Sequence, residues 1–97
     1  MPESPEPVEV VRVPAEERFE IRTGSEPAYL TYAEMDGRLY LMHTEVPREL
    51  GGRGLGGELV RAALEHARGA GMQVVAFCPY AQVWLRRHPE YADLVAG

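Results

Sequence analysis

The sequence contains no lysine, and all ten of its basic residues are arginines. Mechanisms that need a Schiff-base lysine or the lysine of a phosphate-binding P-loop are therefore excluded. Cysteine is nearly absent as well: Cys78 is the single one, so no internal disulfide framework can form. From this free thiol and the lack of a recognisable signal peptide we expect a reducing, cytoplasmic setting. The longest apolar run, around Val74–Cys78, is far too short to span a bilayer.

The charge is acidic overall, with a formal net charge of −5. This argues against a general nucleic-acid binder, because affinity for phosphate backbones comes largely from clustered cations. The 97 residues leave room for one sheet with one or two helices. Met1–Pro7 is rich in proline and glutamate and predicts a disordered tail. We expect residues 8–97 to form a single domain, in which Val8–Val13 adds an edge strand that Pro14 ends.

Alternation and turn residues predict an antiparallel meander of three strands in the first half of the chain. Phe19–Arg22 alternates apolar and charged residues, and Thr23–Pro27 is turn material. Ala28–Met35 and Arg38–Val46 flank Asp36-Gly37. A dipeptide of this kind between two β-rich runs is the strongest short-range hairpin signal.

The pattern then changes to helical periodicity. Apolar positions recur at Leu55, Leu59, Ala62, Ala63, His66, Ala67 and Ala70, and Gly69 and Gly71 are expected to stop the helix. We interpret His66, on the apolar stripe, as a packed histidine. Met72–Cys78 is a nearly continuous apolar run, which predicts a strand buried on both faces and parallel to Arg38–Val46 through a right-handed crossover.

A short helix should follow, starting at Pro79 or Tyr80 and ending at Pro89, with Cys78 as its N-cap. Trp84, Arg87 and His88 are expected to form an aromatic and basic cluster on it. The predicted fold class is therefore α+β: an antiparallel meander, a helix, a parallel strand and a short terminal helix.

Glycines crowd the segment between the meander and the long helix, at positions 51, 52, 54, 56 and 57. Arg48 and Arg53 stand beside them. Glycines allow a ligand to approach the backbone closely, and the amides and dipole of a helix N-terminus attract anions. The segment therefore predicts an anion site that suits a pyrophosphate.

Other interpretations of this segment are weaker. Gly52–Gly57 matches G-x-G-x-x-G. A dinucleotide-binding domain, however, requires a βαβ unit and an acidic residue after its second strand, and the sequence predicts neither. The P-loop pattern fails for lack of lysine. Glycines that only start a helix remain a possible interpretation, although one or two would suffice.

Several segments together resemble the GCN5-related N-acetyltransferases. They are Leu41-Met-His-Thr-Glu-Val-Pro47, Gly51-Gly-Arg-Gly-Leu-Gly56, Leu59 with Ala62-Ala-Leu64, Cys78-Pro-Tyr80 and Arg87-His-Pro-Glu-Tyr91. The last two resemble the minimal single-domain branch with a cysteine at the active site. The resemblance extends from about Ala28 to Tyr91.

The resemblance implies acetyl-CoA as the cofactor and no metal. It implies that the segment Gly51, Gly52, Arg53, Gly54, Leu55, Gly56 and Gly57 holds the pyrophosphate through its amides. Glu45 and Val46 would pair with the amides of pantetheine. At this point the predicted strands Arg38–Val46 and Met72–Cys78 would separate from each other. Where the family usually has Arg or Gln, this chain has Gly51, so that Arg48 or Arg53 would have to supply the missing phosphate contact.

Four residues are candidates for the chemistry. Cys78 ends a strand and caps a helix, and a helix N-terminus lowers the pKa of a thiol. It could carry the acetyl group, or it could be a small buried residue. Glu45 and His43 share a strand face and could accept a proton from an amine, unless they only pair with a neighbouring strand. Tyr80 could protonate the departing CoA thiolate or pack under the sheet.

We therefore expect transfer of an acetyl group from acetyl-CoA to an amine or thiol. A CoA-binding module without catalysis is the main alternative, and an interaction domain without a ligand is a third. The acceptor is not identified by the sequence. A monomer or weak homodimer, with no nucleic acid or membrane as partner, is expected.

Overall fold

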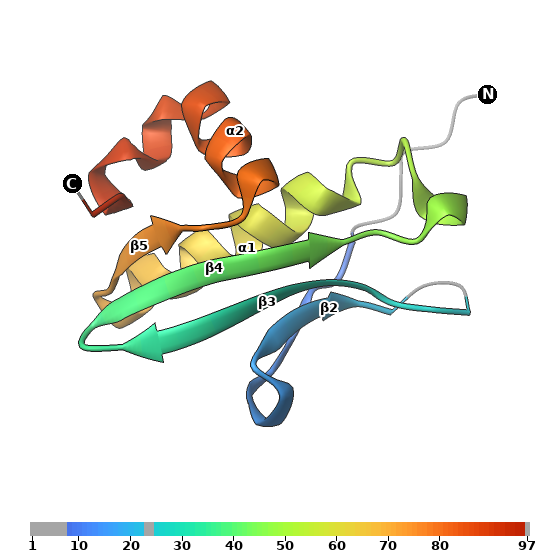
Figure 1. The fold of residues 1–97 in the computed structure, drawn as a ribbon, viewed down its shortest axis with the longest axis horizontal. Helices are drawn as coiled ribbons and strands as arrows, with labels where there is room; N and C mark the ends of the chain where they lie inside the picture. Colours follow the sequence, from blue (N-terminus) through green and yellow to red (C-terminus); the bar gives the residue numbers. More distant parts are fainter. Residues whose placement is uncertain (1–7, 23–24, 97) are drawn as a thin grey trace.

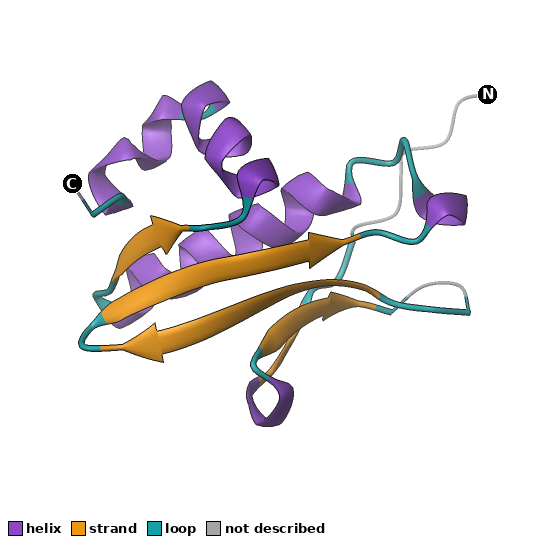
Figure 2. Cartoon of the chain, viewed as in Figure 1, coloured by secondary structure: helices purple, strands orange, loops and turns teal. Residues whose placement is uncertain are grey.

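The computed structural model describes residues 8–22 and 25–96. Its centre is a five-stranded sheet in the order β1-β2-β3-β4-β5 (Figures 1 and 2). The strands are β1 (Val11–Val13), β2 (Arg18–Ile21), β3 (Ala28–Met35), β4 (Arg38–Glu45) and β5 (Gln73–Ala76). Neighbours among the first four are antiparallel, and β5 is parallel to β4. The predicted α+β class and parallel crossover are confirmed.

The hairpin between β3 and β4 has the predicted two-residue turn. Met35 pairs with Arg38 across it, and Asp36 and Gly37 have φ angles of 54° and 76°. Two positive φ angles give a turn whose twist matches that of the flanking strands, which is why Asp-Gly is favoured there.

The edge strand is present but shorter than predicted. Pairing starts at Val11, and a 3-10 helix over Pro14–Glu16 ends β1 as the proline suggested. The predicted tail Met1–Pro7 and the first two residues of the predicted turn Thr23–Pro27 lie outside the described residues.

The long helix α1 (Leu55–Ala70) passes behind the sheet in Figure 1. It buries one apolar stripe against the strands: Leu55, Gly56, Leu59, Val60, Ala63, Leu64 and Ala67. Gly71, with a φ of 71°, ends it in the left-handed conformation that glycine adopts without strain. Gly69 lies inside the helix, so the prediction that it shares this role is wrong. His66 is packed as expected, edge-on to Phe19.

Helix α2 (Pro79–Arg87) has the predicted proline in its first turn and Cys78 as N-cap residue. A 3-10 helix over Pro89–Leu94, which was not predicted, follows it and binds back to α1. The Tyr91 hydroxyl donates to the Glu65 carboxylate at 2.6 Å and accepts from Arg61 at 3.3 Å. These bonds hold the end of the chain against α1. Within the described residues, no helix is long and apolar enough to cross a membrane.

The prediction that Met72–Cys78 is buried on both faces is wrong. The strand covers only Gln73–Ala76, and it is the last in the sheet. Val74 is fully buried, but Gln73 is exposed and the Phe77 side chain is 57% exposed, stacked on Tyr40. The apolar character of Met72–Cys78 therefore comes partly from Phe77, which stacks on Tyr40, and from Cys78, the N-cap residue of α2. It does not indicate a central strand.

A β-bulge interrupts β4 at Met42. Thr31 pairs with His43 and Tyr32 pairs with Leu41, so Met42 has no partner on β3. The extra residue shifts the alternation of side chains along the strand. Before the bulge, the side chains of Leu39 and Leu41 face the core. After the bulge, the side chain of Thr44 lies on the core side of the strand, where Thr44 pairs with the fully buried Leu30.

A buried carboxylate lies on β2. Glu20 is only 4% exposed, and it accepts hydrogen bonds from Arg22 (Nε–Oε1 2.8 Å) and from Arg18. Arg18 in turn lies over the Tyr29 ring on β3, 4.7 Å from its centroid. The hydrogen bond from Arg22, followed by that from Arg18, holds the pKa of Glu20 below its ordinary value of 4.5, against the opposing effect of burial.

Glu20→Gln should lower the free energy of unfolding by about 2 kcal/mol at pH 7, because two charge-assisted hydrogen bonds are weakened. A depressed folded-state pKa stabilises the fold above the ordinary value of 4.5, and this stabilisation disappears as the pH falls through the lowered pKa. The difference between wild type and variant in urea unfolding should therefore shrink below pH 4.5. The control is Glu16→Gln, which removes an exposed partner of Arg18 and should change little. A difference that stays constant between pH 7 and pH 4 would contradict this role.

Candidate functional site

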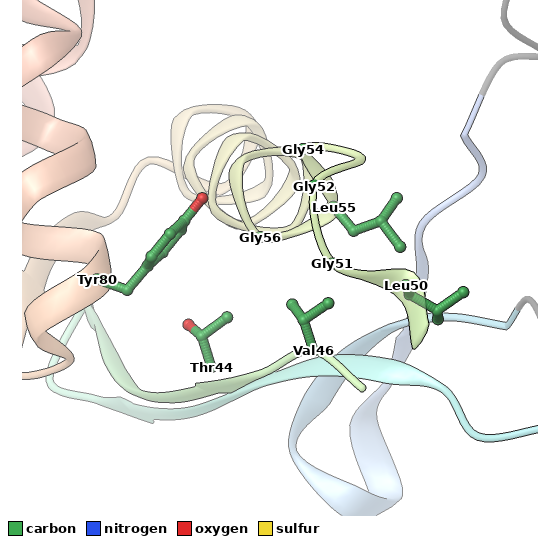
Figure 3. Close-up of a pocket in the computed structure, with 9 residues that line it drawn as sticks. All are labelled: Thr44, Val46, Leu50, Gly51, Gly52, Gly54, Leu55, Gly56 and Tyr80. Atoms are coloured by element: carbon green, nitrogen blue, oxygen red, sulfur yellow. The ribbon is translucent and has the colours of Figure 1, made fainter. Parts of the chain in front are cut away.

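A cavity of about 340 Å³ lies between the end of β4, the N-terminus of α1 and the first turn of α2 (Figure 3). It is lined by Thr44, Val46, Leu50, Gly51, Gly52, Gly54, Leu55, Gly56 and Tyr80. Figure 3 shows the side chains of Thr44 and Val46 rising from the strand toward the glycines, with the Tyr80 ring closing one side. The floor is thus a strand, and the opposite wall is mostly bare backbone.

The bare backbone comes from the turn between β4 and α1. A 3-10 helix over Arg48–Leu50 leads into it, and Leu50 is buried. Gly52 and Gly54 then have φ angles of 79° and 73°, which other residues adopt only with strain. Glycine is therefore required at both positions by the path of the chain, whether or not a ligand binds.

Among residues 8–22 and 25–96, no side chain caps the N-terminus of α1. Gly54 is its N-cap residue and has no side chain to accept from the first turn. The amides of Leu55, Gly56 and Gly57 precede the first intrahelical donor, Glu58, which bonds to the Gly54 carbonyl. Gly54, Leu55 and Gly56 line the cavity, so this end of the helix, with its amides and the positive end of its dipole, borders the space that an anion would occupy.

Gly56 and Gly57 have a different reason to be glycine. A Cβ atom at Gly56 would lie 2.8 Å from the Tyr80 ring, and one at Gly57 would lie 2.9 Å from the Trp84 indole nitrogen. The two helices approach each other through this contact, so Tyr80 is held directly over the first turn of α1. All five glycines were expected to serve the approach of a ligand, and Gly56 and Gly57 also make room for α2.

Arg48 and Arg53, on either side of Gly51, form no ion pairs among the described residues. Gly51 has a φ of −65°, which any residue adopts, although a Cβ there would lie 3.2 Å from the Arg48 carbonyl oxygen. Arg48 and Arg53 are exposed, and neither lines the cavity. Both belong to the segment that supplies the glycine lining, and their guanidinium groups are open to solvent.

Cys78 lies directly behind the cavity wall. The residue is 3% exposed and is not part of the lining. Its Sγ is 3.3 Å from Oγ1 of Thr44, and Thr44 does line the cavity. The backbone amides of Phe77 and Cys78 both donate to the Leu41 carbonyl, at 2.9 and 3.0 Å. Pairing between β4 and β5 stops there, at Leu41–Ala76, while β4 continues to Glu45. The two strands therefore part beside the thiol, as expected.

His43 and Glu45 point to the other face of β4. They share a face, as alternation predicted, and are paired with each other, His43 Nε2 to Glu45 Oε1 at 2.9 Å. Their side chains are 59% and 55% exposed. Because Thr44 lines the cavity, its two neighbours in the strand are directed away from it. The bulge at Met42 is the cause of this arrangement.

The remaining candidates are divided between two places. Tyr80 lines the cavity, with its hydroxyl 3.8 Å from the Cβ position of Gly57. Trp84 stacks on His88 at a centroid distance of 3.7 Å, but Arg61 of α1, rather than Arg87, is the cation over the indole ring. This cluster packs α2 and the chain end against α1, away from the cavity lining.

A second hollow, of about 460 Å³, lies between β5, α2 and the end of the chain. Its lining includes Val75, Leu85 and Arg86. It has no helix N-terminus and no glycine-rich backbone in its lining, so it lacks the unpartnered amides that an anionic ligand would use. The first cavity is therefore the candidate site.

Two lining residues were missed by the sequence analysis. Leu50 forms part of the wall, and Thr44 connects the cavity to Cys78. A bulge that leaves one residue unpaired has no marker in this sequence, because Met42 is neither glycine nor proline. Strict alternation from Leu39 and Leu41 would have placed Thr44 on the wrong face.

Comparisons with known proteins bear on the family and the fold of the chain. The sequence profile of a family described as GCN5-related N-acetyl-transferase matches residues 18–94. The NMR solution structure of "a GCN5-like putative N-acetyltransferase" from Staphylococcus aureus is similar, with a TM-score of 0.73 and 32% sequence identity. The similarity covers 93% of this chain and 89% of that one. The comparison with curated proteins gives no match. The profile covers most of the chain, and the chain belongs to the GCN5-related N-acetyltransferase family.

Proposed function

We propose that the protein transfers an acetyl group from acetyl-CoA to an amine-bearing acceptor, with Cys78 as the intermediate carrier. The observation that carries this proposal is the uncapped N-terminus of α1, which faces a cavity with a cysteine thiol directly behind its wall. Membership of the family supports acetyl-CoA as the donor. Acetyl-CoA would supply a reactive acetyl thioester, and the residues below would bind it and direct the transfer.

The phosphates of CoA fit the turn between β4 and α1. The first-turn amides of α1 have no side-chain cap, and two glycines with positive φ angles bring the backbone to the surface. Arg48 and Arg53 extend this site at its mouth, and we assign to them the charge that Gly51 cannot supply. A pyrophosphate held in this way needs neither lysine nor metal.

The extended pantetheine arm fits the end of β4. Beyond Leu41 the strand has no partner on the β5 side within the part of the chain that the structure describes. The backbone of the segment up to Glu45 and Val46 would therefore offer donors and acceptors to a ligand there. An amide-bearing chain can add to such an edge as a further strand. This alignment leads from the glycine turn, past Val46 and Thr44, toward the thiol.

Cys78 would act as nucleophile. Its thiolate would attack the thioester carbonyl, the bond between the acetyl carbon and the CoA sulfur would break, and the acetyl group would remain on Cys78. The departing CoA thiolate would take a proton from Tyr80, whose hydroxyl lies over the first turn of α1. An acceptor amine would then attack the acetyl-Cys78 carbonyl, Cys78 would leave as thiolate, and the proton lost by the amine would be returned through solvent to Tyr80.

A base must take the proton that the attacking amine loses. Glu45 and His43 are the candidates, because a carboxylate and an imidazole at 2.9 Å can pass a proton between them. They lie on the opposite face of β4 from the thiol. The amine would therefore approach from that face, where β4 and β5 part beyond Leu41.

Titration calorimetry should detect binding of acetyl-CoA and of free CoA to the wild type and to Cys78→Ala, because the thiol is not part of the phosphate or pantetheine contacts. Intact mass after incubation with acetyl-CoA should show one added acetyl group in the wild type and none in Cys78→Ala. Since Cys78 is the only cysteine, the adduct needs no further assignment among thiols.

Each result has a distinct meaning. Binding of acetyl-CoA without an acetyl adduct would contradict the role of Cys78 as acetyl carrier. Direct transfer to the acceptor, or a CoA sensor without catalysis, would then remain. Absence of binding at high ligand concentration would contradict the cofactor assignment itself, and the glycines would then serve the turn and the contact with α2 alone.

Gly56→Ala should weaken acetyl-CoA binding by about tenfold, or about 1.4 kcal/mol. The new methyl group would displace the Tyr80 ring that closes the cavity. The matched control is Gly69→Ala in the same helix, where a Cβ meets nothing within 4 Å. It should raise the free energy of unfolding by about 0.5–1 kcal/mol and leave binding unchanged. If calorimetry gives Gly56→Ala and Gly69→Ala the same affinity for acetyl-CoA, the claim that Tyr80 contributes to binding is contradicted.

A further inference from the structure

Thr44 and Cys78 are brought together by two features of the fold. The bulge at Met42 turns Thr44 toward the core side of β4, and the end of the β4–β5 ladder at Ala76 lets the chain turn into α2 with Cys78 at its start. The result is a contact of 3.3 Å between Thr44 Oγ1 and Cys78 Sγ, across 34 positions in the sequence. Neither residue makes another side-chain hydrogen bond among the described residues.

We propose that Thr44 is a positioning residue that activates Cys78 by donating a hydrogen bond from its hydroxyl to the sulfur. This inference rests on the proposed function, because it assigns a regulator to the cysteine that would carry the acetyl group. A neutral thiol can donate to the threonine oxygen, but a thiolate can only accept. Deprotonation of Cys78 therefore requires the hydroxyl to reverse its role, and a bond made to the charged form favours that form.

The surroundings of the thiol make this single bond important. The side chains that α1 and α2 bury are uncharged: Leu55, Leu59, Val60, Ala63, Leu64 and Ala67 from α1, and Ala81 and Trp84 from α2. On β4, the charged pair of His43 and Glu45 faces the other side of the strand. Tyr80 is the titratable side chain on the cavity side. The N-terminus of α2 and the Thr44 hydroxyl are thus the groups placed to stabilise a negative sulfur.

Thr44 also stands between the thiol and the ligand. It lines the cavity, whereas the thiol behind it does not. Its hydroxyl can keep its hydrogen bond to the sulfur while Cys78 attacks the acetyl group. After transfer, the thioester sulfur of acetyl-Cys78 is a much weaker hydrogen-bond acceptor than the thiolate was. Thr44 would then be released from Cys78 at the stage when the acceptor approaches.

The test is a pH titration of the cysteine Cβ chemical shift in protein labelled with ¹³C-cysteine, which gives one resonance because the chain has one cysteine. In Thr44→Val, which keeps the shape and removes the hydroxyl, the midpoint of thiolate formation should rise by about one to two pH units. Thr44→Ser should restore the wild-type midpoint. The initial rate of Cys78 acetylation by acetyl-CoA at pH 7.5 should follow the same order, with about a tenfold loss in Thr44→Val.

The titration needs no acetyl-CoA, so it is independent of the proposed activity. Equal midpoints in wild type and Thr44→Val would overturn the role of Thr44, even if acetyl-Cys78 forms. A raised midpoint that Thr44→Ser does not restore would also overturn it, because the cause would then be packing. Failure of acetylation in all variants, with the midpoints ordered as expected, would instead contradict the proposed function. Thermal unfolding of each variant confirms that the folded protein is measured.

Discussion

The structure of the site depends on how β4 is paired on its two sides. On one side the bulge at Met42 changes which residues face the core, and on the other side pairing with β5 stops at Leu41. The first event places Thr44 in the cavity and sends His43 and Glu45 to the opposite face. The second leaves the end of the strand without a partner beside the thiol of Cys78. A straight, fully paired β4 would provide neither the free edge nor the contact between Thr44 and Cys78.

The second constraint is the close approach of α1 and α2. Gly56 and Gly57 permit this approach, since a methyl group at either position would meet Tyr80 or Trp84. The contact sets the distance between the uncapped amides of α1 and the start of α2, where Cys78 lies. The hydrogen bonds of Tyr91 to Glu65 and Arg61 hold the chain end on the same helix. The glycine turn and the cysteine belong to separate elements, and packing of the helices keeps them at one cavity.

Much of this could be predicted from the sequence, because the signals are local. The Asp36-Gly37 turn, the periodicity of α1, its stop at Gly71 and the proline at the start of α2 each depend on a few neighbouring residues. What was missed depends on the tertiary arrangement. The run ending at Phe77 suggested a central strand, yet β5 is the last strand of the sheet, and the Phe77 ring after it stacks on Tyr40 of β4. Thr44 could not be recognised because the bulge follows from how β3 and β4 align over their whole length. Val46, Tyr80 and all of the predicted glycines except Gly57 line one cavity, and their roles in binding stay predictions.

The most direct test of the account is a titration of the ¹⁵N-labelled protein with CoA, followed through the backbone amide resonances. If CoA binds at the candidate site, the largest shifts should occur in the turn and first helical turn from Gly51 to Gly57, at Thr44–Val46, and at Cys78–Tyr80. Shifts centred on the hollow of Val75 and Leu85 between β5 and α2, or no shifts at millimolar CoA, would contradict it.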